Sequence, residues 1–200
     1  HEETDEERRQ RHRVEGWRDD LFRTSPMLRF MARHLALVSC DPFDTTPSDN
    51  ATSTPRLEIT ACPPNIAGGF SPSEPKSSSG ILICSNRIMD KGHLEDTLAH
   101  EMVHWWDHCR FRVDWNDLRH HACSEVRAAA LSGDCKLGRE WTRRNYGGFT
   151  KQHQVCARRR AVLSVMANPA CKGGKEEAEK VVDEVFPQCF ADTRPFDEVS

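Results

Sequence analysis

The stretch Leu98-Ala-His-Glu-Met-Val-His-Trp-Trp-Asp-His108 decides how the rest of the chain is interpreted, because it contains one HExxH motif. His100 and His104 are four residues apart, so on an α-helix both imidazoles lie on one face and can bind one metal ion. Glu101 directly follows the first histidine, where a carboxylate orients and deprotonates water in metal-assisted hydrolysis. The motif predicts a catalytic Zn²⁺ site, with His100 and His104 as metal ligands and Glu101 as the catalytic base.

The segments before the motif predict a small sheet. The apolar run 80–85 is typical of a strand, residues 56–61 alternate like a second strand, and Gly68-Gly69-Phe70 indicates a turn into another. The motif itself lies in a segment, 92–111, that is compatible with a helix. This order predicts an α+β fold: a small zincin-like (gluzincin-type) metallopeptidase with a short mixed sheet, an active-site helix and additional disulfide-linked helices. In such a fold an edge strand beside the helix would pair with an extended substrate.

Helices are predicted at both ends of the chain. Residues 1–25 are highly charged, with Val14, Trp17 and Leu21 at helical spacing. Pro26 favours the first position of a second helix, and one face of that helix would carry Leu28, Met31, Leu35 and Val38. We interpret this face as core packing, with membrane-surface contact as the alternative because basic residues lie nearby.

Further helices are expected after the motif, at 118–131, 151–167 and 175–186. We expect a single metallopeptidase domain over residues 1–200. Its parts would be N-terminal helices (1–39), strands and flexible loops (40–90), zinc-site helices (91–135) and cysteine-containing C-terminal helices (136–200).

A peptidase zinc site needs three protein ligands and one open position. Asp107 cannot be the third ligand, because at 1.5 Å rise per residue it lies about 10 Å along the axis from His100. Glu125, 21 residues after His104 on the next predicted helix, would complete a His/His/Glu set. The rival ligands are His121, His120 and Asp114.

Other side chains near the motif have candidate supporting roles. Asp107 would be a carboxylate that orients a ligand histidine. His121, or Tyr146, the only tyrosine, would donate to the oxyanion of the transition state. Arg127 is interpreted as a structural ion-pair partner. Trp105 and Trp106, within the motif stretch, are interpreted as core or pocket wall.

Composition restricts the class of protein and its compartment. The net charge of −3 gives no electrostatic argument for a nucleic-acid partner. Nine scattered cysteines without a CxxC pair favour disulfides formed in an oxidising compartment, and the odd number leaves at least one outside a bridge within this chain. The chain begins at His1, so N-terminal truncation is plausible. No signal-peptide pattern or run of roughly 20 apolar residues is present, which predicts a soluble or peripheral protein.

Longer blocks around and beyond the motif resemble a known family. The blocks are Ala99 to Arg110, Val113-Asp-Trp115, His121-Ala-Cys-Ser-Glu-Val-Arg-Ala128, Leu131-Ser-Gly-Asp-Cys135, Cys-x-x-Arg-Arg-Ala-Val at 156–162, Asn168-Pro-Ala-Cys171, Val185-Phe-x-x-Cys189 and Asp192-Thr-Arg-Pro-Phe196. Over roughly residues 20–200 the chain resembles the mitochondrial inner-membrane metalloprotease that processes and helps assemble ATP synthase.

The resemblance implies a zinc endopeptidase on the intermembrane-space side of the inner membrane, attached peripherally. Its protein substrate would be the precursor of a mitochondrially encoded ATP-synthase membrane subunit, whose N-terminal propeptide it would remove while assisting assembly of the membrane sector. Carried over by position, His100 and His104 are ligands and Glu101 is the base. The resemblance does not give the disulfide map, for which our own suggestion is a Cys171–Cys189 bond that brackets the last helix. The alternatives are an assembly chaperone in which proteolysis is dispensable and a secreted zinc peptidase. The oligomeric state does not follow from the sequence.

Overall fold

The computed structural model describes residues 3–43, 56–64, 66–135 and 152–198. It divides into two compact units, residues 1–111 and 112–200. The first unit contains a small sheet and the helix that carries the HExxH motif, and the second contains helices. This mixed composition confirms the α+β class. The expectation of one metallopeptidase domain over the whole chain stays a prediction.

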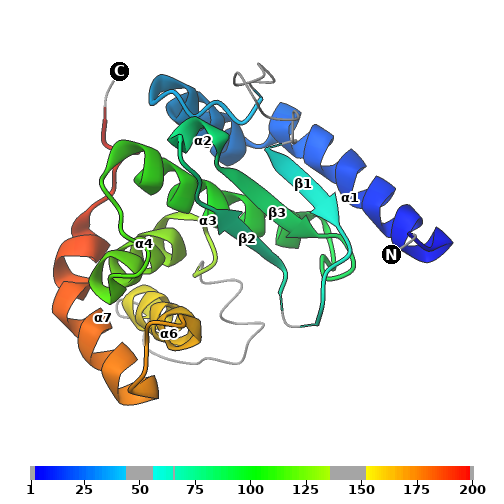
Figure 1. Cartoon of the computed structure of the whole chain (residues 1–200). Helices are drawn as coiled ribbons and strands as arrows, with labels where there is room; N and C mark the ends of the chain where they lie inside the picture. Colours follow the sequence, from blue (N-terminus) through cyan, green and yellow to red (C-terminus); the bar gives the residue numbers. More distant parts are fainter. Residues whose placement is uncertain (1–2, 44–55, 65, 136–151, 199–200) are drawn as a thin grey trace. The chain divides into compact units, whose positions relative to one another are not determined.

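The sheet of the first unit has three strands in the order β1–β3–β2 (Figure 1). The central strand, β3 (Gly80–Cys84), pairs in parallel with β1 (Leu57–Thr60) and antiparallel with β2 (Gly68–Ser71). Ile81 and Ile83 alternate along β3 and are buried, as expected for a strand with one face on a core. The sheet is therefore short and mixed, as predicted, and the two glycines predicted as a turn lie within β2.

Helix α3 (Lys91–Arg110) covers one face of this sheet (Figure 1). Its N-cap is Asp90, whose side chain accepts a hydrogen bond from the backbone N–H of His93. This bond satisfies an amide that has no partner within the helix. The helix buries a row of apolar side chains at a spacing of three to four residues. They are Leu94, Leu98, Met102 and Trp105. α3 packs against α1 and α2 as well as against β2 and β3, and burial of this row fixes its rotation about its axis.

Two N-terminal helices, α1 (Asp5–Thr24) and α2 (Pro26–Leu37), also pack against α3. Their buried apolar residues are Val14, Leu21, Leu28, Met31 and Leu35. Trp17 of the predicted stripe is only half-buried, with the guanidinium of Arg13 5.2 Å from its ring centroid. Val38 lies beyond the last residue of α2, as its C-cap, and is half-buried. The core-packing interpretation of α2 is therefore confirmed for its first three positions.

A lysine side chain caps the C-terminal end of α3. Lys76, at the start of the short 3₁₀ helix Lys76–Ser78, donates from Nζ to the carbonyl oxygens of His108 and Phe111, 2.6 Å away in each bond. Both oxygens lie at the end of the helix where carbonyl groups lack intrahelical partners and the dipole is negative. The segment between β2 and β3 thus stabilises the helix that carries the motif.

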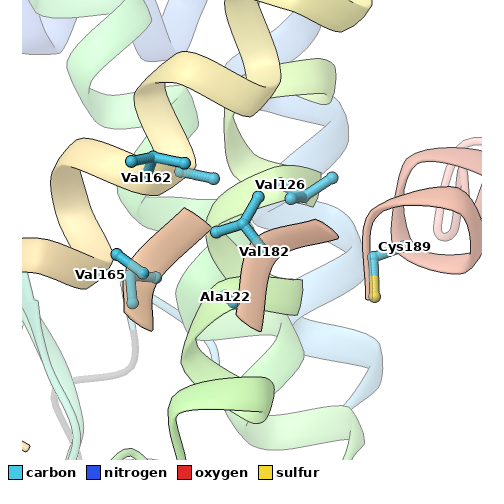
Figure 2. Packing of buried hydrophobic residues seen from close by; sticks show 8 residues of the cluster. Ala122, Val126, Val162, Val165, Val182 and Cys189 are labelled. Carbon is cyan, nitrogen blue, oxygen red and sulfur yellow. The ribbon is translucent and has the colours of Figure 1, made fainter. Parts of the chain in front are cut away.

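The second unit consists of α4 (Leu118–Leu131), α6 (Gln152–Ala167) and α7 (Gly174–Ala191), which pack against one another. Small and β-branched side chains form the core between them (Figure 2). The buried residues are Ala122, Val126, Ala161, Val162, Val165, Ala178, Val182 and Cys189. α4 has the predicted bounds, and α6 is described from Gln152, since residue 151 of its predicted range lies outside the described residues. α7 extends past the predicted end at 186, because Pro187 lies inside the helix rather than after it.

The chain has four disulfides, two within each unit. In the first unit Cys40 bonds to Cys109 and Cys62 to Cys84, and in the second Cys123 bonds to Cys189 and Cys135 to Cys156. The disulfides expected from the cysteine content are therefore confirmed. The ninth cysteine, Cys171, is free.

The suggested Cys171–Cys189 pairing is wrong. The two residues lie near opposite ends of α7, and the 15 residues from Gly174 to Cys189 extend about 22 Å along a helix. A disulfide requires Cα atoms no more than about 7 Å apart. Cys189 instead lies beside α4, where its Cα is 5.3 Å from that of Cys123.

Candidate functional site

The two histidines of the motif converge on one point. The Nε2 atoms of His100 and His104 are 3.1 Å apart, and the ring planes are inclined at 77°. Two nitrogens at tetrahedral positions on one Zn²⁺, each about 2.05 Å from it, lie about 3.3 Å apart. The donor atoms and their separation therefore fit a shared metal ion. The structure places both candidate ligands in the arrangement that the helical spacing predicts.

The segment around His104 is deeply buried. Every residue from Met102 to His108 is buried, and His104 itself is 4% exposed. Trp105 and Trp106 are buried completely or almost completely, in agreement with their interpretation as core. Because the neighbouring side chains are fixed by packing, the imidazole of His104 is held on a rigid helix, as a ligand must be to bind without a large loss of entropy.

Glu101 is half-buried and follows His100 on the same helix. One residue corresponds to about 100° of rotation around a helix. Its carboxylate is therefore offset from the face that His100 and His104 share, beside a metal site rather than among its ligands. The role of Glu101 as catalytic base stays a prediction.

The last turn of α3 carries two further polar side chains, Asp107 and His108, both buried. His108 donates from Nε2 to the carbonyl oxygen of Ser73 at 3.3 Å, and its ring centroid is 5.6 Å from that of Phe70. Burial lowers the pKa of His108, against the hydrogen bond to Ser73, which raises it. His108 thus connects α3 to the segment that follows β2. Orientation of a ligand histidine by Asp107 stays a prediction.

Glu125 lies on α4 and is 7% exposed. Its Oε1 is 3.2 Å from Nε2 of His121, one turn earlier on the same helix. His121 is therefore directed at the predicted third ligand, which is the position of a group that orients a metal ligand. Of the other two rivals, His120 lies in the first turn of α4 and Asp114 lies before the helix. Nδ1 of His120 accepts a hydrogen bond from the backbone N–H of Asp114 at 3.1 Å.

A residue to which the sequence analysis gave no role contacts His121. Nδ2 of Asn168 is 2.9 Å from Nδ1 of His121, although the two residues are 47 positions apart. In the sequence, Asn168 and the proline after it indicate only the end of a helix. No local pattern relates it to α4.

Arg127 has the structural role expected of it. It is 2% exposed, forms an ion pair with Asp192 at 2.6 Å, and donates to the carbonyl oxygens of Asp192 and Arg194 at 2.8 Å and 2.6 Å. These contacts attach the segment after α7 to α4. Tyr146, the other candidate oxyanion donor, lies outside the described residues.

Comparison with known proteins decides the family. The model of the peptidase M76 family matches residues 12–197. The chain belongs to this family. The M76 match includes the HExxH helix, α4 with Glu125, and the turn with Asn168, so it identifies the chain as a peptidase.

Curated relatives of this M76 peptidase share its sequence over nearly all its length. The mitochondrial inner membrane protease ATP23 of Mycosarcoma maydis is 62% identical over 210 residues, which cover 100% of this chain and 96% of the relative. The protein of the same name from Malassezia globosa is 58% identical, covering 98% and 80%, and that from Neosartorya fischeri is 49% identical, covering 94% and 73%. No solved structure matches the chain.

These relatives confirm the resemblance noted in the sequence. All three are named as proteases of the mitochondrial inner membrane. Among the described helices, none is both long and apolar enough to cross a membrane.

Proposed function

We propose that this M76 peptidase is a zinc-dependent endopeptidase with a zincin-like active site, its ion held by His100, His104 and Glu125. The observation that carries the proposal is the 3.1 Å separation of the two Nε2 atoms on α3, in a chain that belongs to a metallopeptidase family. Two imidazoles and a carboxylate are the ligand set of thermolysin-type zinc sites.

The choice of Glu125 rests on its place in the sequence and on its surroundings in the second unit. It lies 21 residues after His104, on the helix that follows the motif helix. A carboxylate that is 7% exposed is costly unless hydrogen bonds or a cation compensate for lost hydration. One of its hydrogen bonds comes from His121, and an ionised carboxylate can accept several bonds at once.

The chain's own residues supply the proton transfers and the binding of substrate. When bound, zinc acts as a Lewis acid toward the scissile carbonyl and promotes ionisation of water. Glu101 takes one proton from the attacking water as its oxygen bonds to the carbonyl carbon. It then delivers that proton to the nitrogen of the breaking C–N bond, so that an acid and an amine leave. A carboxylate beside the ligands, and not among them, is placed for both transfers.

β2 is the strand that we propose pairs with the substrate. It lies at an edge of the sheet and packs against α3, and the ring centroid of its Phe70 is 6.4 Å from that of Trp105. An extended peptide added to this edge would receive backbone hydrogen bonds along its length.

We propose that the chain acts in mitochondria, peripherally on the intermembrane-space side of the inner membrane. The names of its relatives supply the organelle and the membrane, and its four disulfides suit an oxidising compartment. The proposed substrate is the N-terminal propeptide of a mitochondrially encoded ATP-synthase membrane subunit.

The variant Glu101→Gln tests the proposal. We expect it to bind zinc as the native chain does and to lose hydrolysis of a propeptide substrate, because the amide cannot accept the proton. Glu58→Gln, the same substitution at an exposed position of β1, is the control and should retain activity. Hydrolysis by the Glu101 variant at the native rate would disprove the mechanism, and absence of zinc from the native protein would disprove the metal site.

A second function, assistance of membrane-sector assembly without proteolysis, is favoured by an exposed apolar surface on α6. Val155, Leu163 and Met166 are 63%, 56% and 38% exposed and lie within about 80° of helical rotation. Cells that carry only Glu101→Gln would still assemble the membrane sector if this role is separate. Leu163→Glu would then impair assembly while leaving propeptide cleavage intact, and the reverse pattern would refute it.

A further inference from the structure

Asn168 lies in the turn between α6 and α7, and its side-chain amide has a defined orientation. Oδ1 accepts a hydrogen bond from the backbone N–H of Ala170 at 2.8 Å. An N–H group can only donate, so the atom facing Ala170 must be the amide oxygen. The NH₂ group is therefore the end that faces the other way, toward α4.

This NH₂ group has two partners, one for each hydrogen. Nδ2 donates to the carbonyl oxygen of Trp115 at 3.2 Å and is 2.9 Å from Nδ1 of His121. Because an amide nitrogen only donates, Nδ1 of His121 must accept and cannot carry a hydrogen. His121 is consequently a neutral imidazole with its hydrogen on Nε2.

The hydrogen on Nε2 points to Glu125. Nε2 is 3.2 Å from Oε1 of Glu125, and an ionised carboxylate only accepts hydrogen bonds. The three side chains therefore form a line of hydrogen bonds with one direction, from Asn168 through His121 to Glu125. The ring of Trp115 lies against that of His121, with centroids 6.2 Å apart, and further restricts the imidazole.

We propose that Asn168 is a positioning residue of this peptidase: it selects the tautomer in which His121 donates to Glu125 and so orients the carboxylate toward the metal ion. The hydrogen bonds belong to the second unit alone, whereas their purpose rests on the proposed role of Glu125 as a ligand. Partners that orient a metal ligand contribute about 10–100-fold to metal affinity.

A purely structural role for Asn168 makes different predictions. The bond from Ala170 closes the turn, and any residue with an acceptor at the position of Oδ1 would preserve it. Asn168→Asp keeps that acceptor and the size of the side chain, but replaces the donor to His121 with an acceptor. The variant should therefore keep the turn intact while changing the tautomer of His121.

The first experiment measures the tautomer directly, by nitrogen-15 NMR of the His121 ring in the full chain without metal. We expect the native ring to carry its hydrogen on Nε2, and Asn168→Asp to protonate Nδ1. Asn168→Ala should give a mixture of tautomers. Hydrogen on Nδ1 in the native protein, or an unchanged ring spectrum in the Asp variant, would overturn the inference.

The second experiment measures zinc affinity by competition with a chelator. Asn168→Ala should weaken zinc binding about tenfold, whereas in a His121→Phe background the same change should have no further effect. The control is Asn86→Ala, because Asn86 also uses both ends of its amide, on the backbone of Cys62, and touches no candidate ligand.

The results distinguish failure of this inference from failure of the proposed function. Equal losses of affinity in the two backgrounds would show that Asn168 acts through the fold and not through His121, and native affinity in Asn168→Ala would exclude positioning. Either result would be compatible with the proposed function as a zinc peptidase. A native chain that binds no zinc would refute the metal site, and with it the purpose assigned to Asn168, whatever the tautomer of His121.

Discussion

The Nε2 atoms of His100 and His104 lie 3.1 Å apart on successive turns of α3. Replacing either histidine removes one of these two candidate metal-binding nitrogens. Loss of an outer partner of a metal ligand already costs about 10–100-fold in affinity. We therefore expect His104→Ala to lower zinc affinity by more than about 100-fold. Metal analysis of the purified variant measures the loss.

The same variant predicts how a chelator acts on stability. A ligand present at 100 times its Kd stabilises the folded state by about 2.7 kcal/mol. Chelation should therefore lower the Tm of the native chain and leave that of His104→Ala unchanged. His12→Ala is the control, because His12 is exposed on α1. Equal chelator sensitivity in the native chain and His104→Ala would contradict a zinc site at this pair.

Much of the motif helix and its sheet follows from local patterns. The apolar alternation in β3 and the spacing of buried residues in α3 are properties of neighbouring residues, so they are visible in the sequence. The spacing of four between His100 and His104 determines their common face in the same way. The bounds of α4 were also predicted, because strong helix formers precede Gly133.

Contacts between distant residues could not be predicted. Lys76 reaches the end of α3 from 32 residues away, and Asn168 reaches His121 from 47 residues away, so neither contact leaves a pattern in the sequence. Cysteine pairing has the same limit: the partner that we suggested for Cys189 from the sequence is excluded by the length of α7. The end of α7 was predicted too early, at 186, because packing of α7 against its neighbours outweighs the usual cost of the internal Pro187.

The ion pair of Arg127 and Asp192 predicts acid sensitivity of the second unit. Burial alone would raise the pKa of Asp192, but a hydrogen bond from Arg194 and the positive charge of Arg127 together lower it from 3.8 to about 2. Because the folded pKa lies below the unfolded one, the stabilisation is present above pH 3.8 and is lost as the pH falls toward about 2.

Asp192→Asn should therefore reduce the loss of unfolding free energy between pH 4 and pH 2. At neutral pH it should destabilise the chain by about 3 kcal/mol, because the buried guanidinium of Arg127 loses its counter-ion. Asp183→Asn is the control: its partner is Arg158 in an exposed ion pair, so the cost should be below about 1 kcal/mol. Urea titrations at several pH values measure both, and parallel pH profiles of native chain and Asp192→Asn would contradict the assignment.

The disulfides predict a ranking of stability that follows from the length of chain each one closes. Cys123–Cys189 closes 66 residues and Cys62–Cys84 only 22, and restriction of the unfolded chain grows with that length. Removing the first pair by serine substitution should cost about 4 kcal/mol and removing the second about 3 kcal/mol. Cys171→Ser, at the free cysteine, should change the unfolding free energy by less than about 0.5 kcal/mol. Denaturant unfolding of the three variants provides the comparison, and a cost for the Cys62–Cys84 pair equal to or above that for the Cys123–Cys189 pair would contradict the ranking.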